Sequence, residues 1–124
     1  MLLCFVVYKC AVSPTGDRLY ITNRYQNKLH TLARDGTLLA TYTDPALRGP
    51  YGLHVTPAGQ VLVCGGLSST VLQVDREGSR KLATLYTGEM DGVMWPWSVC
   101  YSSTTSSIIV GQWGDDSILV SRVE

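Results

Sequence analysis

Residues 50–75, PYGLHVTPAGQVLVCGGLSSTVLQVD, decide the fold of this chain. Three short apolar runs, LHV, VLVC and VLQV, alternate with segments rich in proline, glycine and serine. Pro57 presets one backbone φ and Gly59 accepts the positive φ that follows, which favours a tight turn. Short strands joined by such turns within about 25 residues indicate an antiparallel meander.

The same meander occurs on both sides of this stretch. Upstream, Pro14 and Gly16 precede Pro57 and Gly59 by 43 positions. Downstream, the sequence PWSVCY, which begins at Pro96, echoes PYGLHV. A fourth strand closes the first two units, as LATY and then as LATL. A period of 42 to 47 residues with four strands is typical of a β-propeller blade, a sheet that buries its faces only against neighbouring blades.

The expected fold is all-β, a partial β-propeller of about three four-stranded antiparallel blades. Residues 1–9 are an atypical N-terminal strand or the start of a fragment, 10–49 are blade 1, 50–94 are blade 2 and 95–124 are an incomplete blade 3. Strands are expected near residues 10–13, 18–22, 29–33, 38–42, 52–56, 60–64, 70–75, 82–86, 98–101, 107–111 and 117–122. Closed propellers have about four to eight blades, so we expect a piece of a longer protein; an open stack, or an oligomer that completes a ring, is the alternative.

Charge and cysteine usage narrow the function classes. Ten basic and ten acidic residues cancel, so the net charge favours neither DNA nor an acidic membrane as a partner. The apolar run at 2–8 is too short to span a bilayer and lacks the flanks of a signal peptide. The cysteines, with no CxxC spacing, are interpreted as buried, reduced thiols of a cytoplasmic protein. They are Cys4, Cys10, Cys64 and Cys100.

The aligned units resemble NHL repeats. PYGLHVTPAGQVLVCGG and STVLQVDREG carry the resemblance best, and it covers nearly the whole chain from Cys10 to Glu124. The chain is similar to the C-terminal propellers of tripartite-motif (TRIM) proteins of invertebrate type, which bind protein or RNA. The resemblance implies a non-catalytic recognition module, the substrate-binding part of a TRIM-NHL ubiquitin ligase whose RING module would lie elsewhere. The motif's glycine is replaced at Lys9 and Ser98.

Two other functions stay open. An RNA-binding propeller would need a basic face. A fragment of a metal-dependent, gluconolactonase-like hydrolase would need inward Glu, Asn and Asp side chains at strand ends, for which Asn23 and Asp91 are poor candidates. His30 and His54 align with apolar or small residues in other repeats, which indicates structural histidines. We therefore expect no catalytic residue, no metal and no cofactor.

The loops point to a binding surface. In this strand order, the loops between second and third strands and the loops that cross between blades share one face. One side should collect Arg24, Tyr25, Asn27, Lys28 and Arg48, and the other Leu67, Met90, Met94, Trp95, Trp113, Asp115 and Asp116. Trp, Tyr, Met and Arg are enriched at interface anchors.

We predict protein binding at this face through Arg24, Tyr25, Lys28, Arg48, Trp95 and Trp113. RNA is the alternative partner, although Asp115 and Asp116 interrupt the basic surface. Tyr51 and Trp97 align with Tyr8 and are interpreted as packing residues of the innermost strands.

Overall fold

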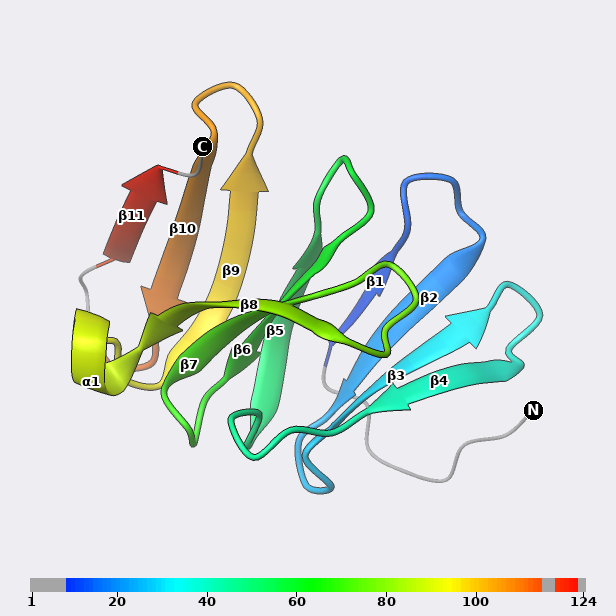
Figure 1. The fold of residues 1–124 in the computed structure, drawn as a ribbon, viewed down its shortest axis with the longest axis horizontal. Helices are drawn as coiled ribbons and strands as arrows, with labels where there is room; N and C mark the ends of the chain where they lie inside the picture. Colours follow the sequence, from blue (N-terminus) through cyan, green and yellow to red (C-terminus); the bar gives the residue numbers. More distant parts are fainter. Residues whose placement is uncertain (1–8, 115–117, 123–124) are drawn as a thin grey trace.

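The computed structural model describes residues 9–114 and 118–122. Its strands form three antiparallel sheets that stand side by side like sectors of a wheel (Figure 1). The first sheet contains β1 (Cys10–Val12), β2 (Arg18–Asn23), β3 (Lys28–Ala33) and β4 (Leu38–Tyr42). The second contains β5 (Pro50–Val55), β6 (Val61–Gly65), β7 (Thr70–Val74) and β8 (Lys81–Thr87). The third contains β9 (Pro96–Ser102), β10 (Ser107–Gln112) and β11 (Ile118–Arg122).

Neighbouring strands in the sequence are neighbours in every sheet, as a meander requires. This confirms the all-β partial β-propeller, with two four-stranded blades and one three-stranded blade among the described residues. We call these sheets blades 1, 2 and 3.

The turn that joins the first two strands has the same geometry in blade 1 and in blade 2. Gly16 and Gly59 adopt φ values of 75° and 88°, and each donates its N–H to the carbonyl three residues earlier, at 2.9 and 2.8 Å. Only glycine adopts such left-handed conformations without steric cost, which is why the Pro-x-Gly turn recurs at this position.

One helical turn, α1 (Gly88–Asp91), interrupts the crossing from blade 2 to blade 3. The Thr87 side chain caps it by accepting the N–H of Met90 at 2.8 Å. Gly92, at φ 70°, ends it in the left-handed conformation. The sequence analysis did not predict this helix, because a single turn is too short to show a helical period.

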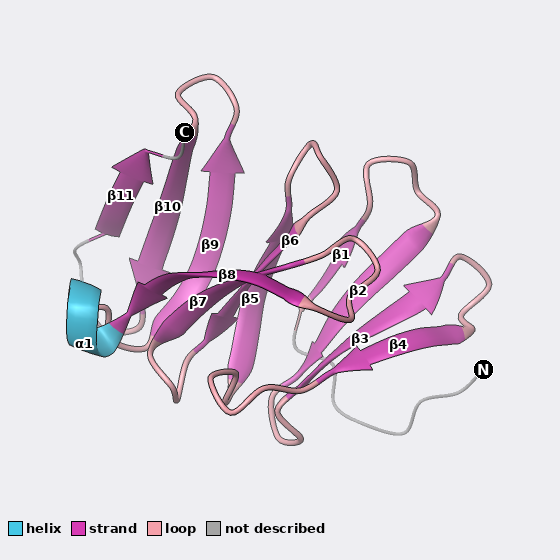
Figure 2. Cartoon of the chain, viewed as in Figure 1, coloured by secondary structure: helices cyan, strands magenta, loops and turns pink. Residues whose placement is uncertain are grey.

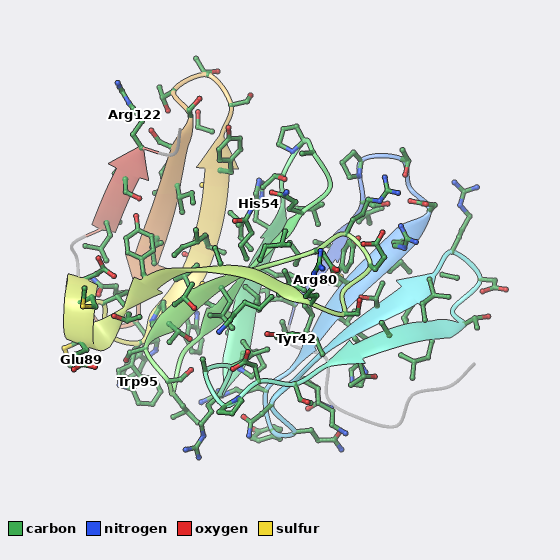
Figure 3. All side chains as sticks on the ribbon, in the orientation of Figure 1. Tyr42, His54, Arg80, Glu89, Trp95 and Arg122 are labelled. Atoms are coloured by element: carbon green, nitrogen blue, oxygen red, sulfur yellow. The ribbon has the colours of Figure 1, made fainter. Side chains whose placement is uncertain are left out.

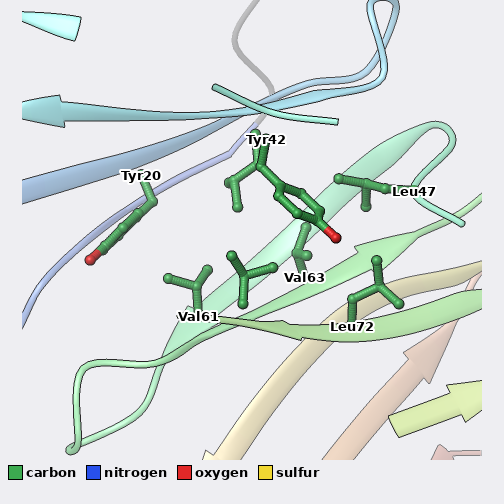
Figure 4. Packing of buried hydrophobic residues seen from close by; sticks show 8 residues of the cluster. Tyr20, Tyr42, Leu47, Val61, Val63 and Leu72 are labelled. Atoms are coloured by element: carbon green, nitrogen blue, oxygen red, sulfur yellow. The ribbon is translucent and has the colours of Figure 1, made fainter. Parts of the chain in front are cut away.

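Two apolar clusters hold the blades together, one at each interface. Residues of β6 contribute to both clusters in alternation, because successive side chains of a strand point to opposite faces. Val61 and Val63 face blade 1, and Leu62 and Cys64 face blade 3. Figure 4 shows the first cluster, in which Tyr20 and Tyr42 of blade 1 pack with Val61 and Val63 of blade 2. The continuous apolar run VLVC is therefore buried on both sides.

Polar contacts also cross the first interface. The hydroxyl of Tyr20 donates to the carbonyl of Arg76 at 2.6 Å, and the hydroxyl of Thr22 donates to the carbonyl of Tyr51 at 2.9 Å. Each pairs a buried side chain with a main-chain group of the next blade, which fixes how the two blades sit against each other.

The cysteines only partly match the sequence expectation. Cys64 is buried, and burial raises the pKa of its thiol. Cys10 and Cys100, however, are exposed, so the expectation of burial was wrong for these two. Cys100 follows the buried Val99 along β9 and therefore points to the opposite face, where no described blade packs. Cys4 lies outside the described residues.

Candidate recognition surface

The loops at one edge of the blades, along the bottom of Figure 2, form the surface that the sequence analysis singled out. We call it the loop face and define it as residues 24–28, 43–51, 66–69, 88–97 and 112–114. It contains the second-to-third-strand loops and the two segments that cross between blades.

Hydrogen bonds join blades 1 and 2 across this face. The N–H of Gly49 donates to Asn27 Oδ1 at 2.8 Å, and the Gly49 carbonyl accepts the N–H of Gly66 at 3.1 Å. The N–H of Leu67 donates to the Arg48 carbonyl at 3.0 Å. The crossing segment is therefore held by the loops on both sides of it.

The crossing into blade 3 is held in the same way. The N–H of Trp113 donates to the carbonyl of Trp95 at 2.9 Å, and the N–H of Met94 donates to Gln112 Oε1 at 2.8 Å. Main-chain contacts of this kind fix the loops before any partner arrives.

Four aromatic rings run across the loop face from blade 2 to blade 3. Tyr51 and Trp97 stack with ring centroids 3.7 Å apart and planes at 22°. Trp113 lies 6.5 Å from Trp97 and 6.1 Å from Trp95, tilted by 48° to each. We call these four side chains the aromatic row. The two Trp113 spacings match those of favourable tilted aromatic pairs, which are stabilising beyond their burial, whereas Tyr51 and Trp97 form a closer stack.

Two cations lie over the first part of the row. Lys9 Nζ is 5.4 Å from the centroid of Tyr51, and Arg24 Cζ is 5.7 Å from the centroid of Trp97. Both distances are within the range in which the ring quadrupole attracts a positive charge. Arg24 comes from blade 1, so its contact with Trp97 connects the first blade to the third.

The far end of the row is open to solvent. Trp113 is 62% exposed and Trp95 is 38% exposed, while Met90 on α1 is 84% exposed. Met94 and Leu67 are exposed as well. Figure 3 shows Trp95 and Glu89 at the same lower corner of the molecule. Exposed apolar side chains gathered in one place are typical of interaction sites.

Trp95 has an unusual backbone. Its φ is 48°, in the left-handed region, and the residue after it is Pro96. The equivalent residue in the preceding repeat is Gly49, with φ 59°, which is followed by Pro50. Both crossings therefore use the same turn, but blade 3 places tryptophan where glycine fits without strain. Strained residues of this kind cluster at functional sites.

The structure brings three of the six predicted site residues together in the row and its contacts: Arg24, Trp95 and Trp113. The other three are on the same face but farther along it. Tyr25 is exposed beside Arg24, Lys28 is half-buried at the start of β3, and Arg48 is exposed in the first crossing. Asp115 and Asp116 lie outside the described residues, as does Tyr8.

Sequence reasoning missed the contribution of Tyr51 and Trp97 to this surface. They do pack on one another, but both are only half-buried, so their rings also belong to the loop face. A signal was available: an aromatic residue occupies the same position of two successive repeats, at the ends of strands that meet near the centre.

A hollow of about 440 Å³ lies between the β2–β3 and β4–β5 loops, and its lining includes Arg48 and Asp44. Asp44 lines it, but its carboxylate is already engaged by the Tyr42 hydroxyl at 2.6 Å and the Ala46 N–H at 2.8 Å. The Tyr42 hydrogen bond is the main reason why the pKa of Asp44 is lowered, and Lys81 lies 3.7 Å away. Asp44 therefore serves the fold, and its ionised carboxylate lies in the same hollow as the guanidinium-bearing Arg48.

A second cavity, of about 280 Å³, separates blades 2 and 3 on the side of the β5–β6 turn. Its lining is mainly apolar and includes Leu62, Tyr101 and Ile108. Gln60 and Gln73 also line it and are hydrogen-bonded to each other. Because these two amides pair with one another, they offer a ligand in the cavity fewer hydrogen-bonding groups. We therefore favour the loop face as the binding site.

Three residues considered for metal or acid–base chemistry, Asn23, Asp91 and His30, have structural partners. Asn23 Oδ1 accepts the N–H of Gln26 at 3.2 Å, and Asp91 Oδ2 accepts the N–H of Thr87 at 2.9 Å. His30 is buried with Nδ1 3.1 Å from the hydroxyl of Thr41, and burial lowers its pKa. Within residues 9–114 and 118–122, no three His, Cys, Asp or Glu side chains are grouped to hold a metal ion. The same residues include no helix long and apolar enough to cross a bilayer.

Several solved structures share this fold. The hydrazine synthase of Kuenenia stuttgartiensis superposes with a TM-score of 0.77 and 22% identity, over 92% of this chain and 32% of that one. A protein of unknown function from Bacteroides caccae superposes with a TM-score of 0.69 and 15% identity, over 89% of this chain and 40% of that one. Virginiamycin B lyase from Staphylococcus aureus superposes with a TM-score of 0.63 and 18% identity, over 94% of this chain and 41% of that one.

No family model and no curated protein matches the chain. The chain spans only about a third to two fifths of the length of the solved proteins it resembles. At such low identities the likeness concerns the fold alone, and it supports a β-propeller without favouring the NHL repeats of TRIM proteins in particular. The chain is a partial β-propeller whose three blades present one continuous loop face.

Proposed function

We propose that this propeller module is a non-catalytic recognition domain that binds a protein partner on its loop face. The aromatic row is the observation that carries the proposal. Four rings and two cations from three blades meet on one face, and the most exposed of the rings, Trp113, is 62% exposed. Tryptophan, tyrosine and arginine are the residues that most often dominate binding energy at protein interfaces.

The rigidity of the face also supports this role. The crossing segments are fixed by main-chain hydrogen bonds, including those from Gly66 to Gly49 and from Trp113 to Trp95. Binding would therefore order few loop residues, and the entropy cost that reduces affinity would be small.

The resemblance of the repeats to NHL propellers extends the proposal to a biological setting. In a longer protein with a RING module, the loop face would select the substrate for ubiquitin transfer. This finer role rests on the repeat sequence, and its test requires the full-length protein.

RNA binding is the second candidate, because rings that alternate with cations form the kind of platform on which unpaired bases stack. Lys9 and Arg24 would contact phosphates beside Tyr51 and Trp97. Binding of this kind weakens steeply with salt. A mobility-shift series with single-stranded RNA at increasing salt separates it from protein recognition.

The direct experiment starts with a photo-crosslinking residue at Met90, on α1 beside the exposed end of the row, in the full-length protein. The matched control carries it at Leu39, which is also exposed but lies on β4 away from the loop face. A partner captured from position 90 and not from position 39 is then purified, and its affinity is measured by calorimetry.

We expect Trp113→Ala and Arg24→Ala each to lower that affinity by about thirtyfold, corresponding to roughly 2 kcal/mol for a well-packed anchor. Their unfolding midpoints should stay close to that of the parent. Normal binding by both variants, or loss of binding only through unfolding, would exclude the loop face. The opposite loops, around Arg34 and residues 76–81, would then be tested.

A further inference from the structure

We infer that Trp95 and Trp113 form a subsite for a cationic side chain of the partner, an arginine or a lysine with or without methyl groups. This inference rests on the proposed function, because it specifies what the partner presents to the loop face. It is carried by three observations on the aromatic row: its internal cation contacts, the open pair of rings at its end, and the distribution of charge around it.

The row already binds cations within the molecule. Lys9 lies over Tyr51 at 5.4 Å, and Arg24 lies over Trp97 at 5.7 Å. The negative face of each ring attracts the positive charge, and tryptophan does so most strongly among the aromatic side chains. The same chemistry is therefore available wherever the row exposes a tryptophan face to solvent.

Trp95 and Trp113 expose such faces. Their centroids are 6.1 Å apart with planes at 48°, so the two rings form a wedge rather than a closed stack. Trp113 is 62% exposed and Trp95 is 38% exposed. The hydrogen bond from the Trp113 N–H to the Trp95 carbonyl, at 2.9 Å, ties the two backbones together. The wedge is thus preformed and accessible.

Charge along the loop face favours a cation at this end. The described charged residues of the crossing into blade 3 are Glu89 and Asp91, both exposed on or beside the helical turn that precedes Trp95. On the loops of blade 1 and the first crossing, the three basic residues Arg24, Lys28 and Arg48 outnumber the one acidic residue, Asp44. A positive side chain is therefore attracted to the wedge, whereas an acidic one is attracted toward the other half of the face.

The test uses small probes that isolate the side chain. The full chain, labelled with nitrogen-15 in its indoles, is titrated with N-acetyl-arginine amide and N-acetyl-trimethyllysine amide. N-acetyl-norleucine amide, which has an apolar stem and no charge, is the matched control. Shifts of the indole N–H signals of Trp95 and Trp113 report binding at the wedge.

We expect saturable shifts with both cations and association at least about threefold weaker with norleucine, the range expected for an exposed cation–π contact. Trp113→Leu should remove this preference, Trp113→Phe should keep part of it, and Glu89→Gln should weaken cation binding and its salt dependence. Leu39→Ala, at an exposed apolar position on β4 away from the loop face, should leave cation binding unchanged.

Equal binding of norleucine, shifts that never saturate, or an unchanged cation preference in Trp113→Leu would each overturn the inference. The outcome is separable from that of the proposed function. If Trp113→Ala abolishes partner binding while the probes show no preference for charge, the loop face is a recognition surface, and the wedge holds an apolar side chain instead.

Discussion

Trp95 has a strained, left-handed backbone conformation, while its side chain contributes to the aromatic row. The equivalent turn in the preceding repeat uses Gly49, and glycine tolerates a positive φ without the clash between Cβ and the following carbonyl. In Trp95 that clash is present, so the local turn alone would favour glycine. The indole instead contributes to the aromatic row, where it contacts Trp113.

This conflict predicts an inverted order of stability. At most positions an alanine variant is more stable than a glycine variant by about 0.5–1 kcal/mol. We expect Trp95→Gly to be more stable than Trp95→Ala by about 1 kcal/mol, because alanine retains the left-handed penalty. Denaturant unfolding of both variants measures the difference, and the same pair of substitutions at Met94 should show the ordinary order. If Trp95→Ala were more stable than Trp95→Gly, the backbone of Trp95 would not be strained.

The two histidines predict a dependence of stability on pH. Burial lowers the pKa of His30, together with the nearby Lys28, and burial also lowers that of His54. The unfolded chain therefore takes up protons more readily than the folded one below the ordinary pKa of 6.5. Stability should be constant above this value and fall as the pH drops from about 7 to about 5.

Thermal unfolding across that range checks the effect, and the double variant His30→Gln, His54→Gln should flatten it. The carboxylate of Asp17 does not interfere, because its ordinary pKa of 3.8 and its folded pKa of about 2, which hydrogen bonds from Thr15 and Ser13 lower, both lie below this range. An unchanged slope in the double variant would assign the pH dependence to other groups.

At the scale of elements, the close approach of β5 to β9 depends on a single glycine. A Cβ on Gly52 would lie 2.4 Å from the carbonyl oxygen of Trp97 and 2.8 Å from Cα of Ser98. In the other two repeats, the position equivalent to Gly52 is occupied by Lys9 and by Ser98. Ser98 is exposed on the side of blade 3 where no described blade packs, and β1 begins only after Lys9. The glycine is thus required where β9 approaches β5.

Gly52→Ala should therefore destabilise the fold by about 2 kcal/mol or more, because β5 must move away from β9 to admit a methyl group. Ser98→Ala, at the equivalent position of the next repeat, should change stability by less than about 0.5 kcal/mol. Denaturant midpoints of the two variants provide the comparison. Similar midpoints would mean that the blades adjust to the added methyl without cost.

The periodicity of turns and apolar runs was sufficient to predict the strands and their order, because each blade is a local meander. It did not show which side chains meet between blades. Tyr51 and Trp97 share one repeat position, but an alignment cannot reveal that their rings stack across the interface. The exposure of Cys10 was missed for a related reason, since burial depends on which faces have a neighbour. The loops could be assigned to one face, whereas the aromatic row required coordinates.

At the scale of the whole molecule, the two end blades have no partner on their outer sides among the described residues. Ile118 and Val120 of β11 are 61% and 59% exposed, and Val12 of β1 and Leu39 of β4 are also exposed. β11 pairs only with β10 among the described strands, so its other edge presents unpaired main-chain groups. Open edges and exposed apolar faces promote association.

We predict that residues 1–124 self-associate or aggregate in isolation, while a longer polypeptide with about six blades is monomeric. Sedimentation velocity over a range of concentrations distinguishes the two. The substitution Val120→Lys should reduce association by placing a charge on the edge strand. A monodisperse 124-residue monomer with a cooperative thermal transition would show that three blades suffice.

The placement of the tryptophans gives the protein a local optical label. All three tryptophans of the chain occur between residues 95 and 113, in blade 3 and the crossing that leads to it. Indole emission therefore originates in one blade, next to the proposed partner, and blades 1 and 2 contribute tyrosine but no tryptophan signal. Fluorescence would detect partner binding without an added dye. The same measurement would overlook melting of blade 1, so circular dichroism is needed beside it to follow the whole propeller.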